Sequence, residues 1–102
     1  MRTINIFLTD PIAGELPDFE NGEMRYAFAR LYSDGPRRLV EGPVCAFVDW
    51  VMEDLSGLEM CRRLRGDPRL DEAHITIVLE QDDADDKRRA LRAGADDYLV
   101  GP

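Results

Sequence analysis

Three short apolar runs, each ending at polar or acidic residues, most restrict how this chain can fold. They are INIFL (residues 4–8), VCAFV (44–48) and ITIVL (75–79), and a shorter run covers residues 98–100. Apolar runs of this length without alternation are typical of strands that are buried on both faces. The sequence therefore predicts a sheet with several buried strands.

Segments with helix signals lie between these runs. The first begins at a capping box, in which Ser56 is followed by Glu59 three residues later, and it ends near Gly66. The second has Asp82 or Asp83 as its N-cap, further acids in the first turn and arginines after them, which suits the helix dipole. Strands that alternate with helices predict an α/β fold with a doubly wound parallel sheet.

The stretch from Gly14 to Gly42 has weaker signals. Residues 25–32, RYAFARLY, fit either strand alternation or helical spacing. The following SDGP reads as a turn, which favours the strand and places a short helix at residues 37–41. Only residues 11–24, which contain Pro17 and Gly22, then remain for a first crossover helix, so we expect that helix to be short and irregular.

Composition limits the classes of function. The 102 residues suit one domain, residues 1–102, and the formal net charge of −8 disfavours direct binding to nucleic acid or to anionic lipid. No apolar run is long enough to cross a membrane, so we expect a cytoplasmic protein. Cys45 and Cys61 lie in apolar segments and are expected to be reduced thiols. Lys87 is the single lysine.

The carboxyl ends of parallel strands meet at one edge of a sheet, where ligands and catalytic groups gather. The four predicted strand ends bring Asp10, Asp49, Glu80 and Gly101 to this edge. A cluster of carboxylates there would suit a divalent cation. The alternative is that an acidic protein simply places acids in its loops. No nucleophile–base pair or glycine-rich phosphate loop accompanies the acids, so we do not expect an enzyme.

Three stretches carry a family resemblance: INIFLTDP, FVDWVMEDLSGLEMCRRLR and ITIVLEQDDADDKRRALRAGADDYLVGP. They resemble the receiver domain of bacterial two-component response regulators, the CheY-like superfamily. The resemblance implies a flavodoxin-like parallel sheet with strand order 2-1-3-4-5, here with a short first helix and with the fifth helix absent. It implies that a histidine kinase phosphorylates Asp49, and that Mg²⁺ is held by Asp10, Asp49 and the backbone carbonyl of Val51.

The same resemblance exposes departures at the site. Thr9 replaces one of two acids, Glu80 replaces a threonine or serine, and Gly101 replaces a lysine. Phosphoryl transfer depends on cationic stabilisation of phosphoryl oxygens, and a carboxylate about 4 Å from such an oxygen costs on the order of 4 kcal/mol at an effective dielectric constant of about 20. No second lysine can substitute, although an arginine could. We therefore predict a degenerate pseudo-receiver with weak or absent Mg²⁺ binding, which acts through protein–protein interaction without phosphorylation. The alternative is a working phosphoacceptor that is modified on Asp49 with Mg²⁺.

Two further expectations follow from the resemblance. Tyr98 stands at the family's aromatic switch position, and with Glu80 in place of a hydroxyl residue we expect it to keep one rotamer.

The first and fifth helices of the fold cover one sheet face, so this face should need another cover. We expect the chain to be the N-terminal part of a longer regulator, and to form a homodimer or to pack against a following domain. Its expected partners are a histidine kinase, an output domain or a second copy.

Overall fold

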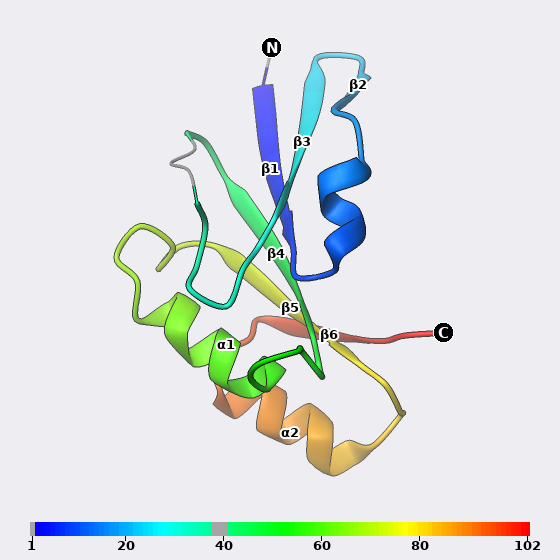
Figure 1. The fold of residues 1–102 in the computed structure, drawn as a ribbon, viewed down its shortest axis with the longest axis vertical. Helices are drawn as coiled ribbons and strands as arrows, with labels where there is room; N and C mark the ends of the chain where they lie inside the picture. The colour runs from blue at the N-terminus through cyan, green and yellow to red at the C-terminus, as the bar shows by residue number, and fades with distance from the viewer. Residues whose placement is uncertain (1, 38–40) are drawn as a thin grey trace.

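A six-stranded sheet with helices packed against it organises the molecule (Figure 1). The computed structural model describes residues 2–37 and 41–102. In chain order the elements are β1 (Arg2–Leu8), the 3-10 helix η1 (Pro11–Glu15), β2 (Phe19–Asn21), β3 (Met24–Arg30), β4 (Val44–Asp49), α1 (Gly57–Arg65), β5 (His74–Leu79), α2 (Ala84–Arg92) and β6 (Asp97–Val100).

The strand order is β2-β3-β1-β4-β5-β6. All neighbouring pairs are parallel except β2 and β3, which are antiparallel. When β2 is set aside, the five parallel strands have the order 2-1-3-4-5, as the family resemblance implies. In this register Ile6 of β1 lies between Phe28 of β3 and Cys45 of β4. The carboxyl ends of β1, β3, β4, β5 and β6 therefore meet at one edge of the sheet.

Residues 24–30 form a strand, so the strand interpretation of this ambiguous segment is confirmed. The predicted turn follows it. The Gly35 N–H donates to the Tyr32 carbonyl over 2.8 Å, and Gly35 has a φ of 101°, which favours glycine. The short helix that we predicted at residues 37–41 falls mostly on residues 38–40, outside the described residues.

The first crossover, residues 11–24, was predicted to be one short irregular helix, but its second part is a strand. Helical structure covers only Pro11–Glu15, and β2 then forms a hairpin with β3. Gly22 occupies the turn with a φ of 63°, directly after Asn21. Asn21 pairs with Met24, so Gly22 and Glu23 are the two turn residues, and glycine at the first of them is a hairpin signal. From the sequence alone, Gly22 was interpreted only as a helix breaker. This segment is therefore a short 3-10 helix and an edge strand.

The two α-helices begin where their capping residues predict. The Glu59 N–H donates to the Ser56 hydroxyl over 3.1 Å at the start of α1. At α2 the cap is Asp83, whose carboxylate accepts from the N–H groups of Asp85 and Asp86 over 2.9 Å each. These side chains satisfy amide groups that the first helical turn leaves without a partner.

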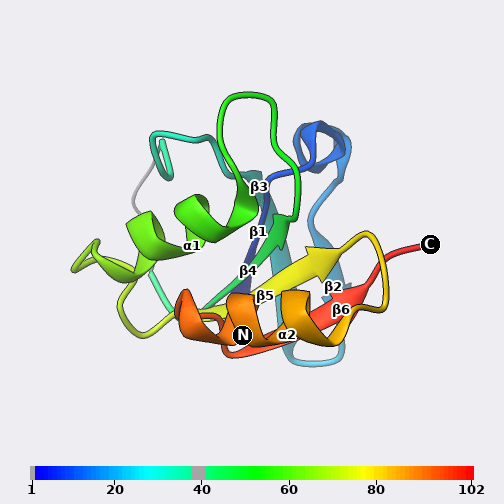
Figure 2. The ribbon, with the colours of Figure 1, turned by 90° about the horizontal axis from the view of Figure 1, so that it is seen from below.

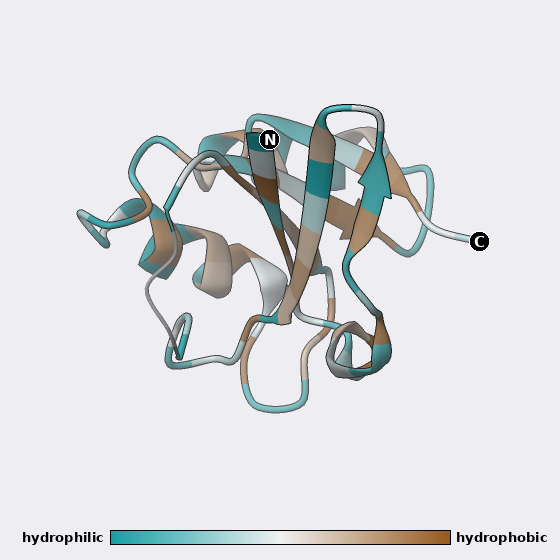
Figure 3. Cartoon of the chain, turned by 90° about the horizontal axis from the view of Figure 1, so that it is seen from above, coloured by the Kyte–Doolittle hydropathy of each residue, from teal (hydrophilic) through white to brown (hydrophobic). Residues whose placement is uncertain are grey.

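The core lies between the sheet and the two α-helices, which lie near each other in Figure 2. Apolar residues concentrate in the central strands, as the hydropathy colours of Figure 3 show. The largest fully buried side chains are Phe7, Leu31, Val48, Met60, Cys61, Ile75, Ile77 and Leu79. On β1, the alternate side chains Ile4, Ile6 and Leu8 point to the opposite face and are only half-buried. This face is less well covered, although η1 packs against β3 and β1.

Two findings bear on the expected class of protein. Cys61 is buried, Cys45 is half-buried, and both are free thiols. Burial raises the pKa of the Cys61 thiol, which keeps it protonated. No helix within residues 2–37 and 41–102 is long and apolar enough to cross a membrane.

Candidate functional site

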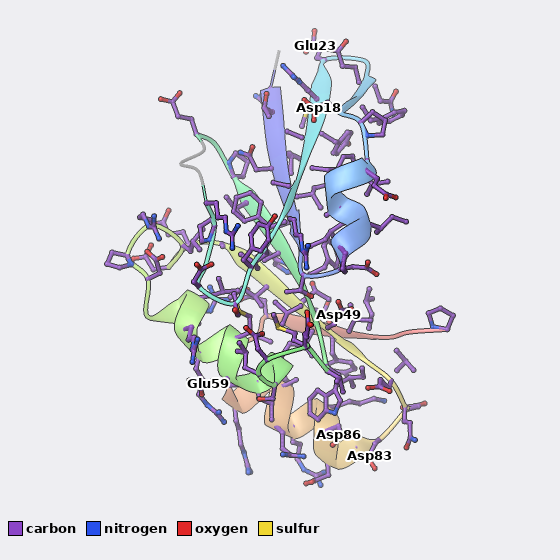
Figure 4. All side chains as sticks on the ribbon, in the orientation of Figure 1. Asp18, Glu23, Asp49, Glu59, Asp83 and Asp86 are labelled. Carbon is purple, nitrogen blue, oxygen red and sulfur yellow. The ribbon has the colours of Figure 1, made fainter. Side chains whose placement is uncertain are left out.

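Asp49, which is labelled in Figure 4, ends β4. Its carboxylate accepts a hydrogen bond from Thr9, which directly follows the neighbouring strand β1. The Thr9 hydroxyl donates to Asp49 Oδ2 over 2.8 Å and accepts from the Asp49 backbone N–H over 2.9 Å. Thr9 is a buried polar residue, whereas Asp49 is half-buried. A neutral hydroxyl thus directly contacts Asp49 at a position where the family resemblance implies an acid.

The backbone on the other side of Asp49 is held by β5 and by the start of α1. The Trp50 N–H donates to the Val78 carbonyl over 2.9 Å, and the Gly57 N–H donates to the Trp50 carbonyl over 3.0 Å. A Cβ atom on Gly57 would lie 2.2 Å from the Asp49 carbonyl oxygen. Glycine is therefore required where α1 approaches the end of β4 this closely.

Asp10 is placed differently from the expectation of a shared metal site. Its carboxylate accepts from the Ile12 N–H over 3.0 Å and caps η1, and its side chain is exposed. Asp10 lines neither of the two cavities that contain Asp49. Within the described part of the chain, no three His, Cys, Asp or Glu side chains come together in a way that could hold a metal ion. Thr9, the side chain that directly contacts Asp49, contributes a neutral hydroxyl instead of a second carboxylate, and Mg²⁺ binds less strongly where fewer carboxylates can hold it.

One cavity beside Asp49, of about 360 Å³, also contains Val51, Glu80 and Gly101. We call it the glutamate cavity. Glu80 directly follows β5 and is exposed, so water screens its charge. The Gly101 N–H donates to the Leu79 carbonyl over 2.8 Å, which continues the pairing of β6 with β5. The structure therefore brings Asp49, Glu80 and Gly101 to one cavity, as their strand ends predict.

A second cavity beside Asp49, of about 560 Å³, contains Arg30 and Arg37 together with Thr9 and Tyr32. We call it the arginine cavity. The two guanidinium groups lie 4.8 Å and 3.6 Å from the centre of the Tyr32 ring, which are cation–π distances. The sequence left an arginine substitute open, but it did not indicate which arginine. The signal was available: Arg30 is the last residue of β3, and it reaches the same sheet edge as the predicted acids.

Tyr98 and Lys87 lie on the side of the sheet that α2 covers. The Lys87 ammonium is 5.4 Å from the centre of the Tyr98 ring and 2.5 Å from a carboxylate oxygen of Asp82. The hydrogen bond to Asp82 raises the pKa of Lys87, which stays charged. Tyr98 is half-buried against the core. Its single rotamer remains a prediction.

Comparisons with known proteins agree with this arrangement. The family model of the response regulator receiver domain matches residues 37–102. The phosphate regulon transcriptional regulatory protein PhoB of Rhizobium meliloti is 37% identical over 60 residues, which are 59% of this chain and 26% of that protein. The response regulator MprA of Mycobacterium tuberculosis strain H37Rv is 38% identical over 76 residues, which are 74% of this chain and 29% of that protein.

A solved structure shares the fold at low sequence identity. The phosphorylated cyanobacterial phytochrome response regulator RcpA aligns with a TM-score of 0.70 and 15% identity, covering 96% of this chain and 80% of that chain. The matched segments span less than a third of the length of PhoB and of MprA. The family model covers more than half of this chain and includes Asp49. The chain therefore belongs to the response regulator receiver domain family of two-component systems.

Proposed function

We propose that this receiver domain is degenerate, and that it signals through protein–protein contact without phosphorylation of Asp49. The observation that carries the proposal is the pair of hydrogen bonds between Thr9 and Asp49, at 2.8 and 2.9 Å. One carboxylate oxygen already has a donor, and the neighbouring acid of the resemblance is a neutral hydroxyl. A cation-assisted transfer onto Asp49 therefore begins with less negative charge to bind the cation.

Weak or absent Mg²⁺ binding is part of this proposal. The site expected from the resemblance is Asp10, Asp49 and the Val51 carbonyl. The Asp10 carboxylate caps η1 over 3.0 Å, which disfavours its use as a ligand beside Asp49. Affinity for a hard divalent cation falls when fewer carboxylates bind it.

The charges in the glutamate cavity support the same conclusion. Glu80 adds a negative charge where a hydroxyl would donate, and Gly101 contributes no cation. Exposure of Glu80 to water reduces its repulsion below the roughly 4 kcal/mol expected for a close, shielded contact. The missing lysine then contributes more to slow phosphorylation than the added carboxylate does.

The surface formed by α2 and β6 is the proposed contact region. Leu91 of α2 and Val100 of β6 are 46% and 45% exposed, which is high for large apolar side chains. Leu99 is 49% exposed but points to the opposite face of the sheet, because side chains alternate along a strand. Exposed apolar groups on neighbouring elements are a common basis for protein association. The proposed partners are a histidine kinase, an output domain or a second copy of the chain. The half-buried face of β1 is a further place for a following domain or a dimer partner.

A working phosphoacceptor is the second candidate function, and the arginine cavity favours it. Arg30 and Arg37 line the same cavity as Asp49, and an arginine can stabilise phosphoryl oxygens as a lysine does. In this alternative Asp49 is the phosphoacceptor with Mg²⁺, and the cation comes from β3 instead of from the last strand.

Incubation with Mg²⁺ and acetyl phosphate, followed by intact-mass measurement, separates the two functions. We expect no adduct, or one that forms at least about a hundredfold more slowly than on a receiver with an intact lysine and hydroxyl. Rapid formation of an adduct that Asp49→Asn abolishes would overturn the proposal. The double variant Glu80→Thr with Gly101→Lys is the positive control, because it restores both missing groups and should form the adduct faster.

A further inference from the structure

Arg30 lines the arginine cavity, and its side chain has a hydrogen-bond donor without a partner. Its Nε atom is buried and has no hydrogen-bond partner. Across residues 2–37 and 41–102, the Arg30 side chain forms no hydrogen bond or ion pair, and its contact with the Tyr32 ring is a cation–π interaction. A buried donor without an acceptor is costly, so such an atom indicates a missing acceptor.

Arg37 lines the same cavity, but its Nε atom has a partner and its side chain is exposed. Its Nε atom lies 3.9 Å from a carboxylate oxygen of Asp34, and its side chain is 63% exposed. It also stacks on Tyr32 at 3.6 Å. Arg37 thus has a carboxylate partner and contact with water, whereas Arg30 has neither at Nε. The two arginines form a matched pair for a test.

The backbone around Arg30 is held by several contacts. The next residue, Leu31, is buried, and its N–H donates to the Leu8 carbonyl over 2.8 Å. The Ser33 hydroxyl donates to Asp54 over 2.5 Å, which joins the loop after β3 to the loop after β4. A cation on such a scaffold is already positioned, which lowers the entropic cost of binding a ligand.

We infer that Arg30 binds a phosphoryl oxyanion in the arginine cavity, with the guanidinium group donating to phosphoryl oxygens. The chemistry is shared by two sources: a free phosphate ion, or a phosphoryl group carried by Asp49. In the second case Asp49 attacks the phosphorus atom of acetyl phosphate, the phosphorus–oxygen bond to the acetyl group breaks, and acetate leaves with the electron pair. The inference goes beyond the proposed function, since the free ion requires no phosphorylation.

Carboxylates that line the arginine cavity weaken the binding of a phosphate ion, because like charges repel. Asp34 is paired with Arg37, whereas Asp49, Glu53 and Asp54 keep their negative charges and oppose an anion. Substitution of Asp49 by asparagine removes the negative charge at the end of β4. Asp49→Asn should therefore bind free phosphate about tenfold more tightly than the wild type.

The test for the free ion is titration of inorganic phosphate into Asp49→Asn, followed by calorimetry and by fluorescence of Trp50, the single tryptophan. In this background, Arg30→Gln should weaken phosphate binding at least about tenfold, and Arg37→Gln should weaken it less than about threefold. Circular dichroism spectra check that each variant is folded. Equal losses in the two arginine variants, or no loss in Arg30→Gln, would contradict a specific role for Arg30.

The second arm tests the phosphoryl group on Asp49. Wild type and Arg30→Gln are incubated with acetyl phosphate and Mg²⁺, and the adduct is followed by mass spectrometry. If wild type is modified, Arg30→Gln should slow the modification about tenfold, while Arg37→Gln should not. A modified wild type overturns the proposed function but supports this inference when the reaction depends on Arg30. Absence of saturable phosphate binding together with absence of an Arg30-dependent adduct overturns the inference.

Discussion

The half of the molecule from β4 to β6 is packed differently from the half from β1 to β3. In the half from β4 to β6, α1 and α2 cover the sheet, and Ile75 and Ile77 of β5 have no exposed surface. In the half from β1 to β3, one five-residue 3-10 helix packs against the strands, and Ile4 and Ile6 of β1 stay half-buried. The family model also matches only residues 37–102. We therefore expect the half from β4 to β6 to contribute more to the free energy of unfolding than the half from β1 to β3.

The candidate site lies where these two regions meet. Thr9 and Arg30 come from the less covered region, while Asp49, Glu80 and Gly101 come from the covered one. The acceptor carboxylate is thus held on a well-packed strand, and the groups that distinguish this site reach it from strands with fewer buried contacts. Substitutions in the less covered region should change the groups around Asp49, and substitutions in the covered region should change the position of Asp49 itself. The comparison can therefore be tested.

The largest difference should come from equal truncations in the two regions. Ile77→Ala removes a fully buried side chain and should lower the free energy of unfolding by about 3–4 kcal/mol. Ile6→Ala removes a half-buried side chain and should cost about 1–2 kcal/mol. Urea unfolding followed by circular dichroism measures both. Equal losses would show that the two regions are packed equally well.

A smaller effect is expected from glycine substitutions at the two ends of α1. Gly57→Ala places a Cβ atom 2.2 Å from the Asp49 carbonyl oxygen, so the backbone must shift, and we expect a loss of about 2–3 kcal/mol. Gly66→Ala meets its nearest atom at 3.5 Å and should change stability by less than about 1 kcal/mol. The amide NMR signal of Asp49 should move in Gly57→Ala only. A tolerated Gly57→Ala would contradict the tight approach of α1 to the site.

The pH dependence of stability should reflect the contacts between Arg65 and Asp96. Partial burial alone would raise the pKa of Asp96, but the Ile75 N–H, at 2.8 Å, and the Arg65 guanidinium hold it below its ordinary value. A lowered folded-state pKa means that the stabilisation is present above the pKa of the unfolded chain, and is lost as the pH falls through the folded-state value. Asp96→Asn should therefore destabilise the protein at pH 7 by about 1 kcal/mol, with screening by water included, and have less effect near pH 3.

Urea midpoints of wild type and Asp96→Asn, measured from pH 7 to pH 3, test this prediction. The two curves should converge at low pH. Asp18→Asn in the β2–β3 hairpin is a comparison from the other region, where an exposed carboxylate lies 2.5 Å from Arg25. Its effect should be below about 1 kcal/mol because exposed ion pairs stabilise proteins little. Curves that stay parallel would remove Asp96 as the titrating group.

The smallest effects should come from the N-caps. Ser56→Ala removes the hydroxyl that accepts from Glu59 at 3.1 Å, and should lower the free energy of unfolding by about 1 kcal/mol. Asp10→Ala removes the cap of η1 and should cost only a few tenths of a kcal/mol, because the 3-10 helix is short and its cap is exposed. Thermal unfolding measures both. A larger loss in Asp10→Ala would give η1 a greater role in the fold than its packing indicates.

Local patterns predicted the elements whose signals lie within a few residues. Ser56 and Asp83 marked both α-helices, and the apolar runs marked β1, β4, β5 and β6. The hairpin of β2 with β3 was missed, although Gly22 carried a turn signal, because a short polar edge strand has no apolar run. Arg30 was missed for a related reason. An ambiguous segment offered no definite strand end at which to place it.

The sequence by itself determined the alternation of strands and helices, the position of Asp49 at a strand end, and the presence of Glu80 and Gly101 where the family resemblance implies a hydroxyl and a lysine. Apolar periodicity and capping residues act over a few positions, so they can be read without a fold. Only the tertiary structure decided that Thr9 binds Asp49, that Asp10 caps η1 and that Arg30 lines the same cavity as Asp49. These residues are 19–40 positions from Asp49 in the chain, and side-chain contacts across such separations depend on how strands and loops pack, which no local pattern specifies.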